Sequence, residues 1–267
     1  MKIKGRTFII SGGASGLGRA CVEDLCKNGA NVAVLDLNEE NGQDTVRAVG
    51  SSSARFFPCD VTDTDSIAAA VMGAVSWAQE TGKPLGGVIP VAGIANPTML
   101  LDRDGEPTPL SAFDLVLSVN LRGTLDLIRQ SLPHMTSSPS TSRPEGGDGE
   151  RGVVIMVSSV AAYDGQRGQT AYAASKGAVA SMALPMAREL ARHGVRVVAI
   201  APGIFESPMS KLMAPKVRKS LEGAVEFPRR LGRAGEFADL VRHVIENVML
   251  NGTVLRLDGG IRLPSKM

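Results

Sequence analysis

Aromatic residues and cysteines are scarce in this sequence, and neither sign of charge dominates it. Phe, Trp and Tyr make up 4% of the 267 residues, which argues against a platform that stacks nucleic-acid bases. The net charge is +2 and no block of like charges occurs, so we expect no surface dedicated to nucleic acid. The three cysteines fit no metal or redox spacing, and their odd number favours a reducing compartment.

Long apolar segments are also missing. No apolar run approaches the ~18 residues of a membrane span. The opening "MKIKGRTFIISGG" has no long apolar segment before a cleavage site, so no secretory signal is expected. His134, His193 and His243 lie outside every motif described below, and no metal site is predicted. A hydrophobic share of 43% is ordinary for a soluble globular protein, which we expect to be intracellular.

Apolar segments rich in β-branched residues alternate with helical patterns along nearly the whole chain. Strands are expected within "RTFIISGG", "ANVAVLDL", "ARFFPCDV", "LGGVIPVAG", "GVVIMVSSVA", "VRVVAIAPG" and "GTVLRLDGG", and helices over 17–28, 39–48, 64–80, 111–135, 172–192 and 236–248. Near-continuous apolar strands separated by helices are typical of a parallel sheet covered on both faces. We therefore predict one α/β domain over 1–267, a Rossmann-like doubly wound parallel sheet with helices on both faces.

Two segments depart from this alternation. Residues 136–150, "TSSPSTSRPEGGDGE", are rich in Ser, Pro and Gly without apolar periodicity, which predicts a mobile surface loop. Residues 204–232 contain three prolines and scattered hydrophobic residues after a strand end. We expect that stretch to be irregular and to form a lid over the substrate.

A glycine-rich turn lies between the first predicted strand and the first predicted helix. Gly12, Gly16 and Gly18 in "SGGASGLGRA" permit a tight turn and let a pyrophosphate approach backbone N–H groups at a helix N-terminus. Such a turn is weak evidence for a nucleotide site by itself, since glycine is common in loops. The strand before it and the helix and strand after it favour a dinucleotide site.

Asp36 ends the next predicted strand, 18 residues after Gly18. That distance is near the ~20 expected of a carboxylate that binds the ribose 2′-hydroxyl, although a solvated loop acid is the alternative. A carboxylate there repels a 2′-phosphate, and the neighbouring Ser15 and Leu37 are both neutral. We therefore predict NAD as the cofactor in preference to NADP.

Tyr172 and Lys176 are four residues apart in "TAYAASKGAVA", which places them on one face of a helix. A nearby cation typically lowers a phenol pKa by about 1–3 units, so the pair could be an activated acid/base. The alternative is a structural helix with one buried ring and one lysine that extends to solvent.

Together these residues and a serine at 159, 13 residues before Tyr172, resemble the short-chain dehydrogenase/reductase family. "SVNLRGT" around Asn120 is similar to the catalytic asparagine segment of that family, "PCDVTD" to its adenine-binding turn and "APGIFESPM" to its nicotinamide-side loop. "SVAAYDGQRGQTAYAASKGA", "FPRRLG" and "LNGTVLRLDGGIRLP" resemble a narrower group, the type-2 3-hydroxyacyl-CoA dehydrogenases.

The resemblance implies a catalytic set of Asn120, Ser159, Tyr172 and Lys176. Tyr172 would accept the hydroxyl proton as hydride leaves for NAD⁺, Lys176 would stabilise the phenolate, and Ser159 would bind the substrate oxygen. Asn120 would interrupt its helix to hold a relay water, or else be an exposed helix amide. Ser158 competes with Ser159, and the spacing favours Ser159.

The resemblance also assigns ligand contacts. NAD contacts beyond the glycines fall on Ser15, Leu17, Asp36, Asp60, Val61, Val91, Phe205 and Ser207, and Tyr172 and Lys176 touch the nicotinamide ribose in the family. Gln166 could face the substrate or be a plain loop amide. Two positions depart from the family pattern: Pro90 replaces a common asparagine, and Glu206 replaces the glycine usual in near relatives.

The expected activity is NAD-dependent oxidation of a secondary alcohol, foremost a 3-hydroxyacyl-CoA. A steroid or specialised-metabolite alcohol is the alternative substrate, and a NAD-binding scaffold subunit is the alternative from another class. The resemblance implies a homotetramer, and no membrane partner is expected. The tripeptide Ser265-Lys266-Met267 is similar to a peroxisomal address, with mitochondrial or cytoplasmic location as the alternatives.

Overall fold

A computed structural model of the chain describes residues 1–136, 148–207, 210 and 215–263. Most of the loop predicted at 136–150 and part of the lid segment therefore lie outside the described residues. The tripeptide Ser265-Lys266-Met267 lies outside them as well, and its role as an address stays a prediction.

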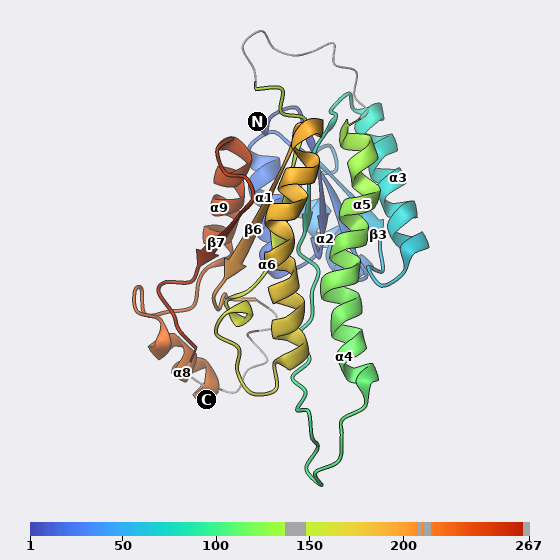
Figure 1. Ribbon diagram of the computed structural model, residues 1–267. Helices are drawn as coiled ribbons and strands as arrows, with labels where there is room; N and C mark the ends of the chain where they lie inside the picture. Colours follow the sequence, from blue (N-terminus) through green and yellow to red (C-terminus); the bar gives the residue numbers. More distant parts are fainter. Residues whose placement is uncertain (137–147, 208–209, 211–214, 264–267) are drawn as a thin grey trace.

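One parallel sheet organises the described part of the chain (Figure 1). Its strands are β1 (Thr7–Ser11), β2 (Asn31–Asp36), β3 (Ala54–Pro58), β4 (Leu85–Pro90), β5 (Gly152–Val157), β6 (Val195–Pro202) and β7 (Thr253–Leu257). They pair in the order β3-β2-β1-β4-β5-β6-β7, and every pairing is parallel. The predicted doubly wound α/β sheet is confirmed.

Helices cover both faces of the sheet. The principal ones are α1 (Gly16–Lys27), α2 (Glu39–Val49), α3 (Thr64–Glu80), α4 (Leu110–Leu117), α5 (Thr124–Thr136), α6 (Thr170–Leu190), α8 (Pro215–Ala224) and α9 (Ala234–Glu246). The helices α3, α5 and α6 lie on one face and α1, α2 and α9 on the other (Figure 1), and the buried side chains of the two groups form separate cores.

The five inner strands are largely apolar because each is buried on both sides, whereas the outer strands β3 and β7 are partly exposed. In β1, Ile9 points into the core beneath α3 and α5, while Phe8 and Ile10 point into the core beneath α1 and α9. Neighbouring residues of β5 alternate in the same way, with Met156 on the first side and Ile155 on the second. Two-sided burial is what distinguishes a strand of a covered parallel sheet from a half-exposed one.

Two of the predicted elements differ from the structure. The single helix expected over 111–135 is interrupted by a π-helical turn, η1 (Ser118–Gly123), between α4 and α5. The stretch 204–232, expected to be irregular, contains the helix α8. Pro215 is the first residue of that helix, where a missing N–H and a fixed φ are tolerated, so this proline starts a helix and does not break one.

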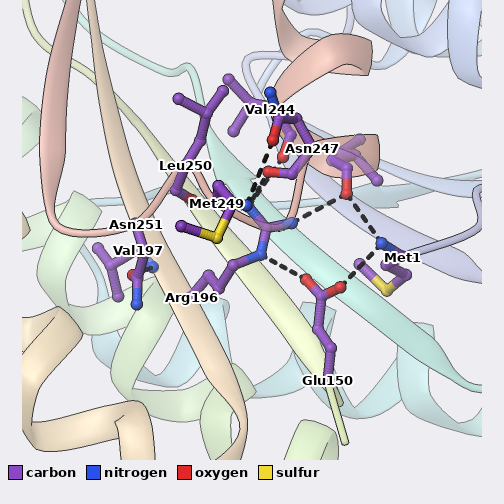
Figure 2. A network of polar contacts seen from close by, with 10 residues as sticks. Met1, Glu150, Arg196, Val197, Val244, Asn247, Met249, Leu250 and Asn251 are labelled. Atoms are coloured by element: carbon purple, nitrogen blue, oxygen red, sulfur yellow. Dashed lines mark hydrogen bonds and ion pairs between the residues drawn. The ribbon is translucent and has the colours of Figure 1, made fainter. Parts of the chain in front are cut away.

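Buried Arg196 secures the amino end of β6, opposite to the strand ends described next (Figure 2). Its guanidinium donates to the carbonyls of Val244, Ile245 and Leu250 at the end of α9 and beyond it. Its Nε lies 2.6 Å from the carboxylate of Glu150. A buried arginine needs such partners for its donors, and together they join α9 to the sheet.

Among the described residues, no helix combines the length and the apolar character that crossing a bilayer would require.

Candidate active site

The predicted site residues gather at the carboxyl ends of the strands, around the neighbouring strands β1 and β4. From β1 the chain proceeds outward through β2 to β3 and then returns to the other side of β1 as β4. Ligands of doubly wound sheets bind at such a reversal, in the crevice outside the strand ends.

The glycines of the turn after β1 allow the backbone to pack closely at the start of α1. A Cβ on Gly18 would lie 2.1 Å from the carbonyl oxygen of Gly12, and one on Gly12 would lie 2.8 Å from the amide nitrogen of Ala92. The N-cap residue of α1, Ser15, makes no side-chain cap hydrogen bond, and the first turn of α1 contains no acidic residue. Leu17 packs partly against the core beneath. The start of α1 therefore fits an anion such as a pyrophosphate.

Asp36 lies beside this turn, as predicted. One of its carboxylate oxygens accepts a hydrogen bond from the N–H of Ala14 at 3.1 Å, and the other accepts from the N–H of Asn38 at 3.0 Å. Leu37 follows with 71% of its surface exposed. The end of β2 thus presents a fixed hydrogen-bond acceptor and an apolar side chain, which together fit the adenosine half of a dinucleotide.

Asp60, Val61 and Val91 continue the rim of the crevice. Asp60 accepts from both the N–H and the hydroxyl of Thr62, and these hydrogen bonds lower the pKa of its carboxyl below the usual value. The N–H of Val91 donates to the carbonyl of Ser11 at 3.1 Å, so β4 continues to pair with β1 past Pro90. The departure at Pro90 therefore leaves the strand pairing intact.

Asn120 is fully buried within the π-helical turn η1, which excludes the exposed helix amide as an interpretation. Its side-chain oxygen accepts from the N–H of Ile94 at 2.8 Å, and its Nδ2 donates to the carbonyl of Ile94 and to the hydroxyl of Ser175. The predicted interruption of the helix is present. The amide side chain, however, is bonded to protein groups, so it holds the chain after β4 in place against α6.

Lys176 is buried beside Asn120 and on the same helical face as Tyr172, as the sequence spacing predicted. Its Nζ donates to the carbonyl of Val157 at 2.9 Å and lies 5.8 Å from the centre of the Tyr172 ring. Burial lowers the pKa of this ammonium to about 8. A Cβ on Gly93 would lie 3.3 Å from the same Nζ, so the glycine keeps this corner of the site open.

Ser159 lies beside Tyr172. Burial raises the pKa of the Tyr172 phenol above its ordinary value, and the nearby Ser159 hydroxyl only partly opposes that rise. The expected net lowering of this pKa is therefore absent in the chain by itself, because the loss of hydration outweighs the other effects. The competing Ser158 donates to the carbonyl of Lys176 at 2.8 Å, which directs it away from the phenol and agrees with the choice of Ser159.

The remaining predicted residues lie on the segments after β5 and β6. The ring of Phe205 is buried 6.2 Å from that of Phe237, so its side chain belongs to the core. Ser207 exchanges hydrogen bonds with Ser210. Half-buried Gln166 begins a turn in which its N–H donates to the side chain of Gln169, just before α6.

Sequence reasoning missed the partners that hold the catalytic candidates. Ser175 accepts from Asn120 and donates to the carbonyl of Tyr172 at 2.7 Å, so one hydroxyl joins η1 to α6. Ile94 and Val157 contribute backbone groups only. The signal for Ser175 was its position beside Lys176 in "ASK", whereas backbone partners leave no signal in side-chain identity.

Comparisons with known proteins agree with this geometry. The sequence profile described as short chain dehydrogenase matches residues 6–218. The human and Drosophila melanogaster proteins named 3-hydroxyacyl-CoA dehydrogenase type-2 are 42% and 39% identical over 98% of this chain, which spans 97% and 99% of their lengths. A crystal structure of 3-hydroxyacyl-CoA dehydrogenase type-2 from Mycobacterium avium has a TM-score of 0.89 at 33% identity, with 98% of each chain covered.

The chain belongs to the short-chain dehydrogenase/reductase family and is an oxidoreductase. The resemblance inferred from its motifs is confirmed. A protein of this family with a Rossmann-like fold generally binds a nicotinamide cofactor.

Proposed function

We propose that this enzyme interconverts a 3-hydroxyacyl-CoA and the corresponding 3-ketoacyl-CoA with NAD. The observation that carries the proposal is that Ser159, Tyr172 and buried Lys176 lie together at the strand ends. The substrate class rests on the names of relatives 39–42% identical over nearly the whole chain. The steroid alcohol remains the second enzymatic candidate from the sequence.

The cofactor site fits NAD through four groups. The start of α1 and the glycine turn would hold the pyrophosphate, and Asp36 would bind the adenosine ribose. Exposed and neutral Leu37 offers an apolar contact where a 2′-phosphate would need a cation. Lys176 and Tyr172 would contact the nicotinamide ribose. NAD⁺ bound there would supply the acceptor for the substrate hydride.

The chain's own residues would move the proton. In oxidation, the Tyr172 oxygen takes the substrate hydroxyl proton, and the Ser159 hydroxyl donates a hydrogen bond to the substrate oxygen. Lys176 favours the phenolate when its ammonium is charged, and its pKa of about 8 places that charge within the range of physiological pH. Asn120 and Ser175 fix the helix turn that presents these groups.

Initial rates with both cofactors and a panel of substrates test this function. The panel contains acetoacetyl-CoA, a short and a long 3-hydroxyacyl-CoA, and a hydroxysteroid. We expect the highest kcat/KM for a CoA thioester with NAD. A preference for the steroid would transfer the assignment to the alternative substrate, and NAD binding without turnover of any alcohol would favour the scaffold.

We further propose that the enzyme forms a homotetramer. Two features support this: half-exposed Leu115 and Leu125 on neighbouring helices, and the unpaired outer edge of β7. Such patches and edges commonly mark interfaces. Light scattering at micromolar concentration should give about four times the 27.9 kDa chain mass. A mass of one chain would refute the tetramer.

A further inference from the structure

Arg256 on the last strand, β7, connects three parts of the chain. Its Nε donates to Asp258 at 2.7 Å, and its Nη2 donates to Asp164 at 2.7 Å and to the carbonyl of Ile261 at 3.2 Å. The guanidinium carbon also lies 5.3 Å from the centre of the Tyr163 ring. Asp164 is distant in sequence from Arg256, and it belongs to the turn that begins at Ser159.

That turn is short and internally bonded. Ser159 is the N-cap of η3 (Val160–Ala162), and its hydroxyl accepts from the N–H of Ala161 at 3.1 Å. The N–H groups of Tyr163 and Asp164 both donate to the carbonyl of Val160, at 2.9 and 2.8 Å. A force on the Asp164 carboxylate is therefore transmitted through one helical turn to the Ser159 hydroxyl.

A small apolar cluster covers the same connection. Val160, Val225 and Ile261 are buried together, with Ile204 and Leu263 against them. These residues come from the catalytic turn, the segment after α8, the exit of β6 and the segment after β7. The cluster is separate from both main cores, so the position of the Ser159 turn depends on the end of the chain and not on the sheet packing alone.

We propose that Arg256 is a positioning residue that holds the Ser159 hydroxyl toward the reacting oxygen through Asp164. The proposal rests on the function above, in which Ser159 binds the substrate oxygen. Arginine suits this place because its planar fork can bind two carboxylates and lie on an aromatic ring at once, which the point charge of a lysine cannot do. Arg256 itself acts only through the turn.

A double-mutant cycle on kcat separates positioning from general stability. Arg256→Met should lower kcat about tenfold in the enzyme with Ser159, because small displacements of a substrate-binding group are costly. In the Ser159→Ala background the same change should lower kcat by less than about twofold, since the group that Arg256 positions is gone. Asp164→Asn, which keeps the shape of the partner and removes its charge, should give the same pattern. Equal losses in both backgrounds, or no loss in either, would overturn the proposal.

Arg262→Met is the matched control. Arg262 also pairs with Asp258, at 3.3 Å, and donates to the carbonyl of Ile261, but no bond connects it to Asp164. We expect its kcat to equal that of the wild type in either background. A loss as large as that of Arg256→Met would mean that the Asp258 pair matters and the Asp164 connection does not.

Amide hydrogen exchange supplies a readout that does not depend on turnover. Arg256→Met should accelerate exchange of the Tyr163 and Asp164 amides, whereas Arg262→Met should leave them as in the wild type. Unchanged exchange in Arg256→Met would refute the connection even if every acyl-CoA is a good substrate. If the enzyme prefers another alcohol, the cycle is run with that alcohol, so an error in substrate class and an error in this proposal give different results.

Discussion

The floor of the site and the lid segment, residues 204–232, are held by different kinds of interaction. On the floor, Asn120, Ser175 and Lys176 are buried: Asn120 donates to Ser175, and the hydroxyl and ammonium donors of α6 bond to backbone carbonyls. In the lid segment, α8 is tied to the chain after β6 by the ion pair between Arg218 and Glu206, whose side chains are 36% and 55% exposed.

This difference has energetic consequences. Removing a partner from a buried polar network leaves an unsatisfied group, whose desolvation is expensive. Exposed ion pairs contribute little, since water and salt screen them. We therefore expect the floor to fix the chemistry and to tolerate few changes. The exposed ion pair of the lid segment can vary at low cost, which agrees with the unusual Glu206 being found in it, whereas the buried Phe205 and Val225 of the same segment cannot.

The largest effect is expected at Tyr172. Tyr172→Phe should lower kcat by roughly 10²–10⁴-fold, the usual contribution of a general acid/base, while NAD still binds. The control is Tyr163→Phe, which changes the other of the two tyrosines and keeps its ring over Arg256. Steady-state rates and NAD titration check this. A Tyr172→Phe enzyme with more than about 10% of wild-type kcat would exclude Tyr172 as the main acid/base.

Lys176 gives the second prediction, a pH dependence of stability. Burial lowers its pKa from 10.5 to about 8, so between these values the unfolded chain binds a proton that the folded chain lacks. Stability from this group therefore rises as pH increases from 8 toward 10.5, by up to about 1.4 kcal/mol per pH unit. Below pH 8 the folded state bears the full cost of the buried charge.

Denaturant unfolding of the wild type and Lys176→Met at pH 7.5, 8.5 and 9.5 measures this contribution. The substitution also leaves the carbonyl of Val157 without its donor, a cost that does not change with pH. The informative quantity is thus the pH slope of the difference in unfolding free energy. A difference that is flat over this range would show that the lysine is better hydrated than its burial indicates, and the contrast with the lid would weaken.

The sequence was sufficient for the parts of the molecule that periodicity and side-chain identity determine. Burial of a strand on both sides produces apolar runs in the sequence, as around Ile9 and Ile155. The helical face that Tyr172 and Lys176 share follows from their spacing of four residues. Periodicity did not predict the π-helical turn at Asn120, because one extra residue in a helix hardly changes its apolar pattern; the interruption was expected only from the family resemblance. Proline at the start of α8 was misleading, since the same residue both begins and ends helices.

The direction of the Tyr172 pKa shift was missed for a related reason. Proximity of a cation can be inferred from spacing, but the loss of hydration depends on residues brought from elsewhere in the chain. Asn120 bonds to Ser175, which is 55 residues away in the sequence, and to Ile94, which is 26 residues away. Contacts of this length are set by the packing of whole elements, and a single sequence contains no direct record of them.

The effect expected from a substitution at Asp36 is smaller than at the floor residues and larger than at the lid segment. Asp36→Ala should reduce the preference for NAD over NADP by roughly 10–100-fold in kcat/KM, because it removes a charged hydrogen-bond acceptor and the repulsion of a 2′-phosphate. Glu39→Ala is the matched control, since it removes an exposed acid nearby that makes no bond to the glycine turn. Comparable kcat/KM for NAD and NADP in the wild type would contradict the cofactor assignment.

The smallest effect is expected at Glu206. Glu206→Gln removes the ion pair that joins α8 to the chain after β6, and it should change KM for the substrate by less than about threefold, with kcat unaltered, because both partners are solvent-exposed. Wild-type KM should approach the variant's value as salt is raised, since screening removes the same attraction. Glu222→Gln is the control: Glu222 pairs with Arg218 within α8 at 2.9 Å and, among the described residues, its side chain joins the helix to no other element, so the substitution should leave the salt dependence unchanged. A tenfold loss in kcat for Glu206→Gln would mean that the lid segment takes part in positioning the reacting groups, and the division between a rigid floor and an adjustable lid would fail.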